Sequence, residues 1–494
     1  MRVGGSQGSS GIGNPSRWVR MTISSVLGAL GLVDPGAQTF SRPSAGKTLN
    51  ALRASRNFRE SAGNAFYSIA EYIAQPLSMV VAAPFLVHKL GLSQYGVWML
   101  VSAILGSMGI LSTGFGDATV KYVSAYRGQN NPTGVERTIR ATLTINASLG
   151  GLFGLLVWAV APYAVDHIFK IELAFHTASL QAIRISALIL AIRSIESVFV
   201  STLRAFERYG PPVKLNVFLR TIVVVSAVVL AAIGYGVVAI MIATLCWSAL
   251  IVVLQAIAAR RVVGPMNPFP TFEKEALAEV FTFGCFSWLQ ALAGVVFTYA
   301  DRFLVAAMLG TAPVAIYVLC VQAAQPIHGL AAAAFNFVFP HISSRHEAGE
   351  THGPRRVFRL ALLTSIGLSL ALAAPLVLFG KPLLTLWMGA EFAKQAYIVL
   401  AVLAVAHLIL AVNIVPHYTL LALGSVRFVS SVNVLGGIAS LGAVALLIPP
   451  FGLIGASFGR LLYAGVTAVN LLRAKAMLAR AVSRKEEEVV LTSS

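Results

Sequence analysis

Residues 237–258 read VVAIMIATLCWSALIVVLQAIA and contain no charged side chain. A helix needs roughly 20 consecutive apolar residues to cross a hydrocarbon core about 30 Å thick, so this run predicts one membrane-spanning helix. Similar runs recur along most of the 494-residue chain, which is 57% hydrophobic and 11% charged and has a mean hydropathy of +0.78. Soluble globular domains carry about 25% charged residues. The composition therefore excludes an ordinary soluble protein and indicates an all-α polytopic membrane protein.

The hydropathy pattern predicts twelve transmembrane spans. We expect helices because a lipid-exposed backbone must satisfy its own hydrogen bonds, and because the runs are longer than the roughly 9–11 residues of a barrel strand. The predicted spans are 65–88, 97–118, 138–162, 178–202, 212–234, 237–258, 281–308, 312–340, 358–379, 395–421, 428–448 and 452–474. The connections are at most about twenty residues long. They leave no room for a soluble catalytic domain, so we expect neither enzymatic activity nor a cofactor.

The basic residues predict the orientation of the chain. Its net charge is +18, and Lys and Arg near span ends concentrate on the cytoplasmic side of a membrane. With the amino terminus inside, the inner segments hold 28 of the 37 Lys and Arg residues, and the outer loops hold only Lys89, Lys170, Lys381 and Lys394. We therefore expect both termini in the cytoplasm. Because topology accounts for the basic residues, we expect no nucleic-acid partner.

Short matches between the two halves predict an internal repeat. Leu90-Gly91 matches Leu309-Gly310, and Tyr235-Gly236 matches Phe451-Gly452, at similar offsets and at corresponding span ends. Six spans per half place the starts of both halves on the same side, which predicts two parallel six-helix lobes around a central cavity. The predicted parts are a basic, disordered tail (1–62), an N-terminal lobe (63–258), a cytoplasmic linker (259–280), a C-terminal lobe (281–474) and a second cytoplasmic tail (475–494).

Five arginines fall inside predicted spans, and four of them are candidate substrate-binding residues. A charge at the centre of a bilayer costs at least about 2.5–3.5 kcal/mol on insertion scales, so it needs a partner or a watery cavity. The candidates are Arg184, Arg193, Arg220 and Arg460. Two alternatives stay open: Arg193 pairs with Glu196 three residues away on the same face, and Arg184 and Arg220 extend toward the membrane surfaces.

Other polar side chains inside the spans follow helical spacing. Gln75, Gln322, Gln325 and Asn336 could hydrogen-bond a sugar, or could hold membrane helices together. The acids Glu71, Asp117 and Asp301 are candidates for coupling transport to a proton or sodium gradient. No metal site is predicted, because the three cysteines lie in separate apolar runs and the histidines that flank Glu347 do not share a helix face.

Two longer motifs resemble a known family. Residues 90–98 read LGLSQYGVW and residues 114–124 read GFGDATVKYVS, and this pattern is similar to the opening of polysaccharide flippases of the multidrug/oligosaccharidyl-lipid/polysaccharide exporter superfamily, which includes the O-antigen-type flippases. The stretch from Asp301 to Leu304, followed by Leu309-Gly310, resembles the seventh helix of that family. The resemblance covers about residues 60–475.

The resemblance implies a function and a location. Family members move an undecaprenyl-diphosphate-linked oligosaccharide across the bacterial inner membrane by alternating access, often through a cationic cavity that the four arginines would supply here. It also implies membrane lipid and polysaccharide polymerase or assembly proteins as partners. Two other readings stay open: a multidrug or organic-cation antiporter, for which acids should dominate the cavity, and a membrane glycan transferase or ligase, which normally needs a large outer loop.

Overall fold

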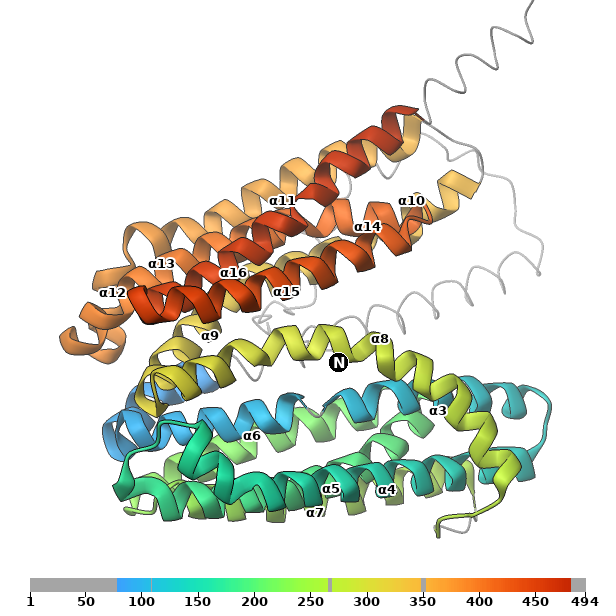
Figure 1. Ribbon diagram of the computed structural model, residues 1–494. Coiled ribbons are helices and arrows are strands. Elements are labelled where there is room, and N and C mark those ends of the chain that lie inside the picture. The colour runs from blue at the N-terminus through green and yellow to red at the C-terminus, as the bar shows by residue number, and fades with distance from the viewer. Residues whose placement is uncertain (1–77, 108, 265–268, 348–351, 481–494) are drawn as a thin grey trace, which may run out of the picture. The chain divides into compact units, whose positions relative to one another are not determined.

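The computed structural model describes residues 78–107, 109–264, 269–347 and 352–480, with the side chains of 109–114, 286–297 and 352 excepted. Glu71, Gln75, the predicted tail 1–62 and most of the predicted tail 475–494 lie outside the described residues. All regular structure in the described ranges is helical, which confirms the predicted fold class. The chain crosses the membrane several times, because many of these helices are long and apolar (Figure 1).

The first described helical stretch, Ser78–Ser107, is followed by a series of labelled α-helices. These are α3 (Gly109–Gly128), α4 (Pro132–Tyr163), α5 (His176–Ala205), α6 (Gly210–Ala232), α7 (Val237–Val263), α8 (Lys274–Met308), α9 (Thr311–Phe335), α10 (Val338–Glu347), α11 (His352–Leu378), α12 (Gly380–Met388), α13 (Ala390–Val412), α14 (Ile414–Ala422), α15 (Val426–Phe451) and α16 (Leu453–Thr467). Helical residues continue over 469–480.

Local sequence explains where these helices begin. At the start of α4, the side chain of Asn131 accepts a hydrogen bond from the backbone N–H of Gly134 at 2.9 Å, and Pro132 occupies the first helical position. Both features stabilise a helix start, because the first turn leaves N–H groups without partners and proline lacks one.

Nine helices in the described part of the chain are long and apolar enough to cross a membrane. Two further helices, α5 with 30 residues and α8 with 35, are also long enough at about 1.5 Å per residue. Charged residues such as Arg193 and Glu196 lower the hydropathy of α5. The predicted count of twelve is compatible with this arrangement, in which the spans 312–340 and 395–421 are each divided between two helices, α9–α10 and α13–α14.

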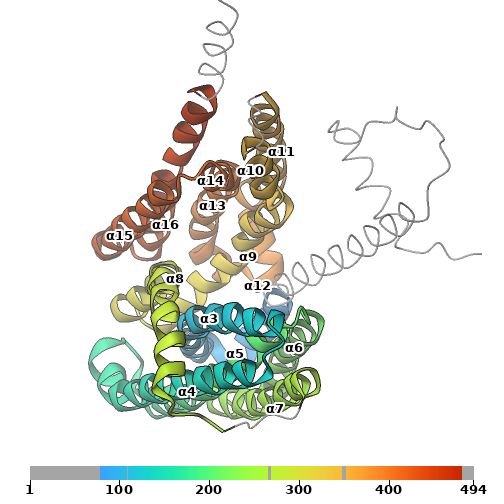
Figure 2. The same cartoon turned by 90° about the vertical axis from the view of Figure 1, so that its right-hand side faces the viewer.

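Two groups of helices follow one another along the chain. Helices α3 to α7 pack together, and α9 to α16 form the second group (Figures 1 and 2). Helix α8 contacts α3 and α4 of the first group as well as α9 and α15 of the second. It begins at Lys274, inside the predicted linker 259–280, and the described linker residues are bonded to α4: Thr144 donates to the carbonyl of Thr271 at 2.6 Å.

Left-handed backbone positions support the predicted repeat. Gly91 and Gly310 both have a positive φ, of 78° and 102°. They belong to the matched dipeptides near the ends of the first and seventh predicted spans. The matched Gly236 and Gly452 each cap the start of the helix that follows, α7 and α16, although φ is −90° at Gly236 and 56° at Gly452. Positive φ is accessible to glycine at little cost, so Gly91 and Gly310 mark similar turns in the two halves.

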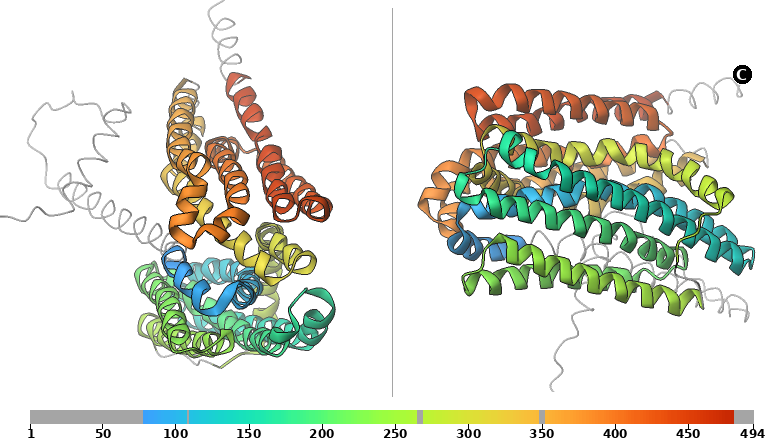
Figure 3. Two further views of the ribbon diagram at one scale, coloured as in Figure 1. Left: turned by 90° about the vertical axis from the view of Figure 1, so that its left-hand side faces the viewer. Right: turned by 60° about the horizontal axis from the view of Figure 1, so that its bottom comes forward.

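The hydrophobic cores show that the two groups of helices are joined at one end. We call the outer end the one that carries residues 89–96, 163–177, 309–311 and 380–394, which the charge pattern assigns to the outside. There a single core includes residues of both groups, such as Trp98, Val165, Tyr317 and Leu400. Among the described residues, the cores at the other end, the inner end, are separate. One lies within α9 to α15 and the helical residues 469–480 that follow α16, and two lie within α3 to α8. Figure 3 (left) shows the two groups of helices in a view along the bundle.

Candidate functional site

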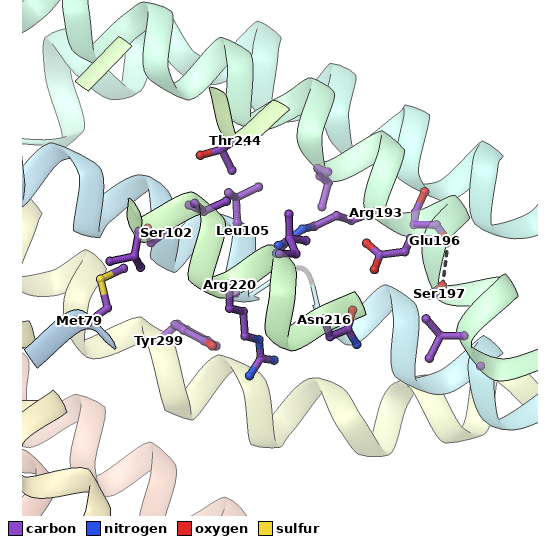
Figure 4. Close-up of a pocket in the computed structure, with 18 of the residues that line it drawn as sticks. Met79, Ser102, Leu105, Arg193, Glu196, Ser197, Asn216, Arg220, Thr244 and Tyr299 are labelled. Carbon is purple, nitrogen blue, oxygen red and sulfur yellow. Dashed lines mark hydrogen bonds between the residues drawn. The ribbon is translucent and has the colours of Figure 1, made fainter. Parts of the chain in front are cut away.

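A cavity of about 500 Å³ opens among the helices of the first group. Its walls come from the helix Ser78–Ser107 and from α3, α5, α6 and α7, with α8 and α9 contributing Tyr299, Arg302 and Gln322 (Figure 4). Trp98 and Met99 lie at its outer end and belong to the shared core, so the cavity ends against the closed side of the structure.

Four arginines line this cavity, and two of them were predicted. Arg193 on α5 and Arg220 on α6 are candidates from the sequence, whereas Arg204 on α5 and Arg302 on α8 are not. The acids in the lining are Asp117 and Glu196. Four guanidinium groups and two carboxylates give the described lining a formal excess of positive charge. Such a cavity favours an anionic ligand.

Glu196 is fixed in the wall by amides. It is 7% exposed, and Gln255, a fully buried residue of α7, donates from Nε2 to Glu196 Oε1 at 2.9 Å. The same amide nitrogen donates to Asn216 Oδ1 at 3.3 Å. The positive charges of Arg193 and Arg220 act on this carboxylate. Arg193 thus interacts electrostatically with Glu196, and Arg220 interacts with the same carboxylate.

The cavity arginines keep hydrogen-bonding capacity. In the described structure the Nε atoms of Arg193 and Arg302 are buried and have no hydrogen-bond partner. Arg302 lies over the ring of Tyr299, 5.0 Å from its centroid. Tyr299 packs in turn against Gly106, where a β-carbon would overlap the ring. Buried donors normally have partners, so these two guanidinium groups are suited to a ligand.

The structure places Arg460 and Asp301 together and apart from the cavity. Arg460 Nη2 on α16 donates to Asp301 Oδ2 on α8 at 2.6 Å, and the hydroxyl of Tyr317 on α9 donates to the same oxygen at 2.8 Å. Asp301 is 4% exposed and Tyr317 is fully buried. The two residues predicted for different roles, substrate binding and ion coupling, therefore form one buried ion pair.

The remaining predicted residues are dispersed. Arg184 stacks on Trp158 at 4.7 Å and lies outside the described lining of the cavity. Gln322 lines the cavity, with its Nε2 3.9 Å from the sulfur of Met99. Gln325 and the exposed Asn336 lie on α9 and at its end, away from the cavity lining. Asp117 is an exposed residue of the cavity wall.

One site residue, Gln255, carried a signal that sequence reasoning did not use, and the Asp301-Arg302 pair carried one that it did. Gln255 is a lone amide in a charge-free run, and such a residue needs a buried partner. Asp301 and Arg302 are adjacent, so they point in different directions and need separate partners. In the structure the two side chains do lie apart: Arg302 lines the cavity and Asp301 is bonded to Arg460. Tyr299 and Arg204 carried no signal of this kind.

The geometry supports binding of an anion and of hydroxyl groups. Arginine side chains bind phosphate through paired N–H groups, and Gln322, Asn216, Ser102 and Ser197 supply amides and hydroxyls in the same cavity. Among the described residues there is no group of three or more His, Cys, Asp or Glu side chains placed to hold a metal ion.

Comparison with known proteins finds similarity to membrane transporters. A putative O-antigen transporter of Shigella flexneri is 20% identical over 403 residues, which cover 80% of this chain and 92% of that protein. The fold is similar to a multidrug resistance MATE family transporter of the MOP superfamily in an inward-facing conformation, with a TM-score of 0.67, 15% identity and coverage of 85% of this chain and 96% of that chain.

A second solved structure has the same fold. The lipid II flippase MurJ, in an inward closed conformation, matches with a TM-score of 0.68 and 10% identity, covering 83% of this chain and 87% of that chain. The family model for polysaccharide biosynthesis proteins matches residues 61–346. Since that match spans more than half of the sequence, the chain belongs to the polysaccharide biosynthesis protein family.

Proposed function

We propose that this protein is a flippase that moves a lipid-diphosphate-linked oligosaccharide across the membrane by alternating access. The observation that carries the proposal is the arginine-lined cavity, which opens between membrane helices and ends against the core at the outer end. The family membership and the similarity to a putative O-antigen transporter and to a lipid II flippase support it. These relatives are transporters and not enzymes.

The cavity chemistry suits the diphosphate of such a substrate. A diphosphate cannot cross hydrocarbon unaided, because moving an ion into a medium of low dielectric constant is very costly. Arg193 and Arg220 would offset its charge, each through paired N–H groups that match phosphate oxygens. Glu196 lies close enough to Arg193 and Arg220 for their positive charges to act on its carboxylate. The charge excess disfavours an organic cation, the ligand of the antiporter alternative.

Polar side chains beside the arginines suit the glycan. Gln322 keeps its Oε1 buried and without a hydrogen-bond partner in the described structure, and Ser102 lies on the same cavity wall. Amides and hydroxyls of this kind bind sugar hydroxyls, with water bridging the longer gaps. In this proposal Gln322 binds the sugar, whereas Gln325 and Asn336 are not part of the described cavity lining.

The closed outer core and the separate inner cores suit a loading state. If the positive charges mark the cytoplasmic side, the substrate enters from the cytoplasm and both termini lie there, in the inner membrane of a bacterium. Release on the other side requires the shared core to part and the inner cores to approach each other. A ligand drives such a change only if it binds the intermediate more tightly than the end states.

Asp117, in the cavity wall, is the acid best placed to couple this step to a proton or sodium gradient. Polysaccharide polymerase or assembly proteins would then use the exported substrate.

The location of lipid-linked oligosaccharide in cells that lack this protein tests the proposal. Complementation with the wild type and with Arg193→Gln compares export at equal protein level. We expect lipid-linked oligosaccharide to accumulate in the cytoplasmic leaflet and surface polysaccharide to be lost, with recovery by the wild type only. Unchanged surface polysaccharide would contradict the proposal and favour drug export. Glycan trapped unattached on the outer face would point to a transferase or ligase instead.

A further inference from the structure

The Asp301 carboxylate is the best-bonded buried acid of the described structure. Oδ2 accepts from Arg460 of α16 at 2.6 Å and from Tyr317 of α9 at 2.8 Å, and Oδ1 accepts from the backbone N–H of Arg302 at 2.8 Å. The side chains of Asp301 and Arg460 are 6% and 17% exposed. The two bonds from other helices, from Arg460 and from Tyr317, fix the angular position of α8 at this point.

The next residue on α8, Arg302, faces the cavity. Successive helical residues are separated by about 100° around the helix axis, so an Asp301 directed into the second group of helices directs Arg302 elsewhere. Arg302 lines the cavity together with Arg193 and Arg220, which come from the first group. Its Nε is buried and without a hydrogen-bond partner among the described residues. Its guanidinium lies over Tyr299, one turn earlier on the same helix.

We propose that Arg302 is a third phosphate-binding arginine of the cavity and that Asp301, Arg460 and Tyr317 are positioning residues that fix how α8 presents it. This inference rests on the proposed function and deepens it by naming the group that the second half of the chain contributes to the ligand. A diphosphate bound by Arg193, Arg220 and Arg302 connects both halves, because Asp301 anchors the same segment of α8 to α9 and α16.

The structure distinguishes this role from direct binding by Arg460. Arg460 is absent from the described cavity lining and its guanidinium is bonded to Asp301. A buried arginine with a carboxylate partner keeps that partner, because separating the two leaves an uncompensated charge. Arg460 therefore acts on the ligand through Asp301 and Arg302. Its effect should disappear when Arg302 is already replaced.

A double-mutant cycle on ligand affinity tests this inference. The probe is farnesyl diphosphate, titrated against the purified full-length chain in lipid nanodiscs. Arg302→Gln should weaken binding at least tenfold, as should Arg193→Gln. Asp301→Asn should weaken it severalfold in the wild-type background and less than twofold when combined with Arg302→Gln. Coupling of this kind is expected when one residue acts through the other, whereas a merely structural role would lower affinity in both backgrounds.

A matched control and a milder variant complete the experiment. Arg127→Gln removes another arginine that lies over an aromatic ring, at 5.4 Å from Phe206, but that is not part of the described cavity lining; the affinity of this variant should equal that of the wild type. Tyr317→Phe removes a single bond to Asp301, and provides the same cycle if Asp301→Asn does not fold.

The outcomes separate this inference from the proposed function. If Arg193→Gln weakens binding and Arg302→Gln does not, the third arginine is refuted while the flippase proposal stands. If Asp301→Asn and Tyr317→Phe weaken binding equally with and without Arg302, the positioning role is refuted. If neither Arg193→Gln nor Arg302→Gln weakens binding, the phosphate-binding cavity itself is contradicted, and this inference falls with it.

Discussion

Gly96 packs against Thr311 so closely that a β-carbon at position 96 would overlap the Thr311 carbonyl oxygen. Gly96 belongs to the first half of the chain, and Thr311 begins α9 in the second. The contact lies in the core at the outer end, next to the fully buried Tyr95 and Val314. A close approach of backbones across two halves requires glycine and seals the outer end of the cavity.

Gly96→Val should open this seal. Forcing a larger side chain into a packed site typically costs about 1–3 kcal/mol, and separation of the two halves relieves the overlap. The measurement uses Ser102→Cys, a cavity-lining position, and a membrane-impermeant maleimide added from outside to a chain without its native cysteines. Labelling of Cys at 102 should rise several-fold. Gly151→Val, at a glycine with open space around its β-carbon position, is the control, and equal labelling in both variants would argue against the seal.

Replacing the cavity arginines should impair export more than insertion. A charge-assisted hydrogen bond contributes about 1.5–3 kcal/mol, so Arg193→Gln or Arg220→Gln should reduce affinity for a prenyl diphosphate by roughly 10–100-fold. Lysine at either position should retain part of the function, because it keeps the charge but not the paired donors. Export of surface polysaccharide is measured at equal amounts of membrane protein. Arg261→Gln, an exposed position at the end of α7, should export normally. Wild-type export by both cavity variants would eliminate the phosphate-binding role.

The Asp301–Arg460 pair should respond differently to single and double replacement. Breaking a buried ion pair by removing one partner costs about 3–5 kcal/mol, whereas replacing both by apolar residues is often nearly neutral. Asp301→Leu should therefore lower the thermal unfolding temperature of the detergent-solubilised protein markedly. The combination Asp301→Leu with Arg460→Met should recover most of that loss. Additive losses in the double variant would show that the two side chains do not depend on each other.

Thr144 should anchor the linker between α7 and α8. Its Oγ1 donates to the carbonyl of Thr271 at 2.6 Å and accepts from the backbone N–H of Thr271 at 2.9 Å. Thr144→Val preserves shape but leaves two buried backbone groups without partners, at about 1–3 kcal/mol each. In inverted membrane vesicles, trypsin should cut the chain near Arg260 and Arg261 faster. The control is Thr221→Val, which affects only a bond within its own helix and should be cut at the wild-type rate. A wild-type cleavage rate in Thr144→Val would show that Thr144 does not anchor the linker.

Much of the fold was predictable because helical spans need only length and hydropathy. The run 237–258 lies within α7, and the matched glycines Gly91 and Gly310 both have left-handed conformations. The matched Gly236 and Gly452 both cap the start of a helix, but only Gly452 has a positive φ. Sequence similarity does not report φ. The shorter helix α12 was not predicted, since nine residues cannot span a membrane.

The candidate site was predictable only in part, because depth in a helix does not fix direction. Arg193 and Arg220 do line the cavity. Arg460 is equally deep in its predicted span, yet its direction brings it to Asp301, and Arg184 turns toward Trp158. Which neighbour a buried arginine meets depends on how distant helices pack, as with α8 and α16, and a single sequence does not carry that information.

Transport by the purified protein is the most direct test of the central claim. The full chain is reconstituted into liposomes with a fluorescent prenyl-diphosphate oligosaccharide, and an impermeant quencher measures how much of it changes leaflet over time. The account predicts that the wild type equilibrates the lipid between leaflets, that Arg193→Gln is strongly slowed, and that Arg261→Gln matches the wild type. Translocation no faster than in protein-free liposomes, or equal rates for the wild type and Arg193→Gln, would contradict it.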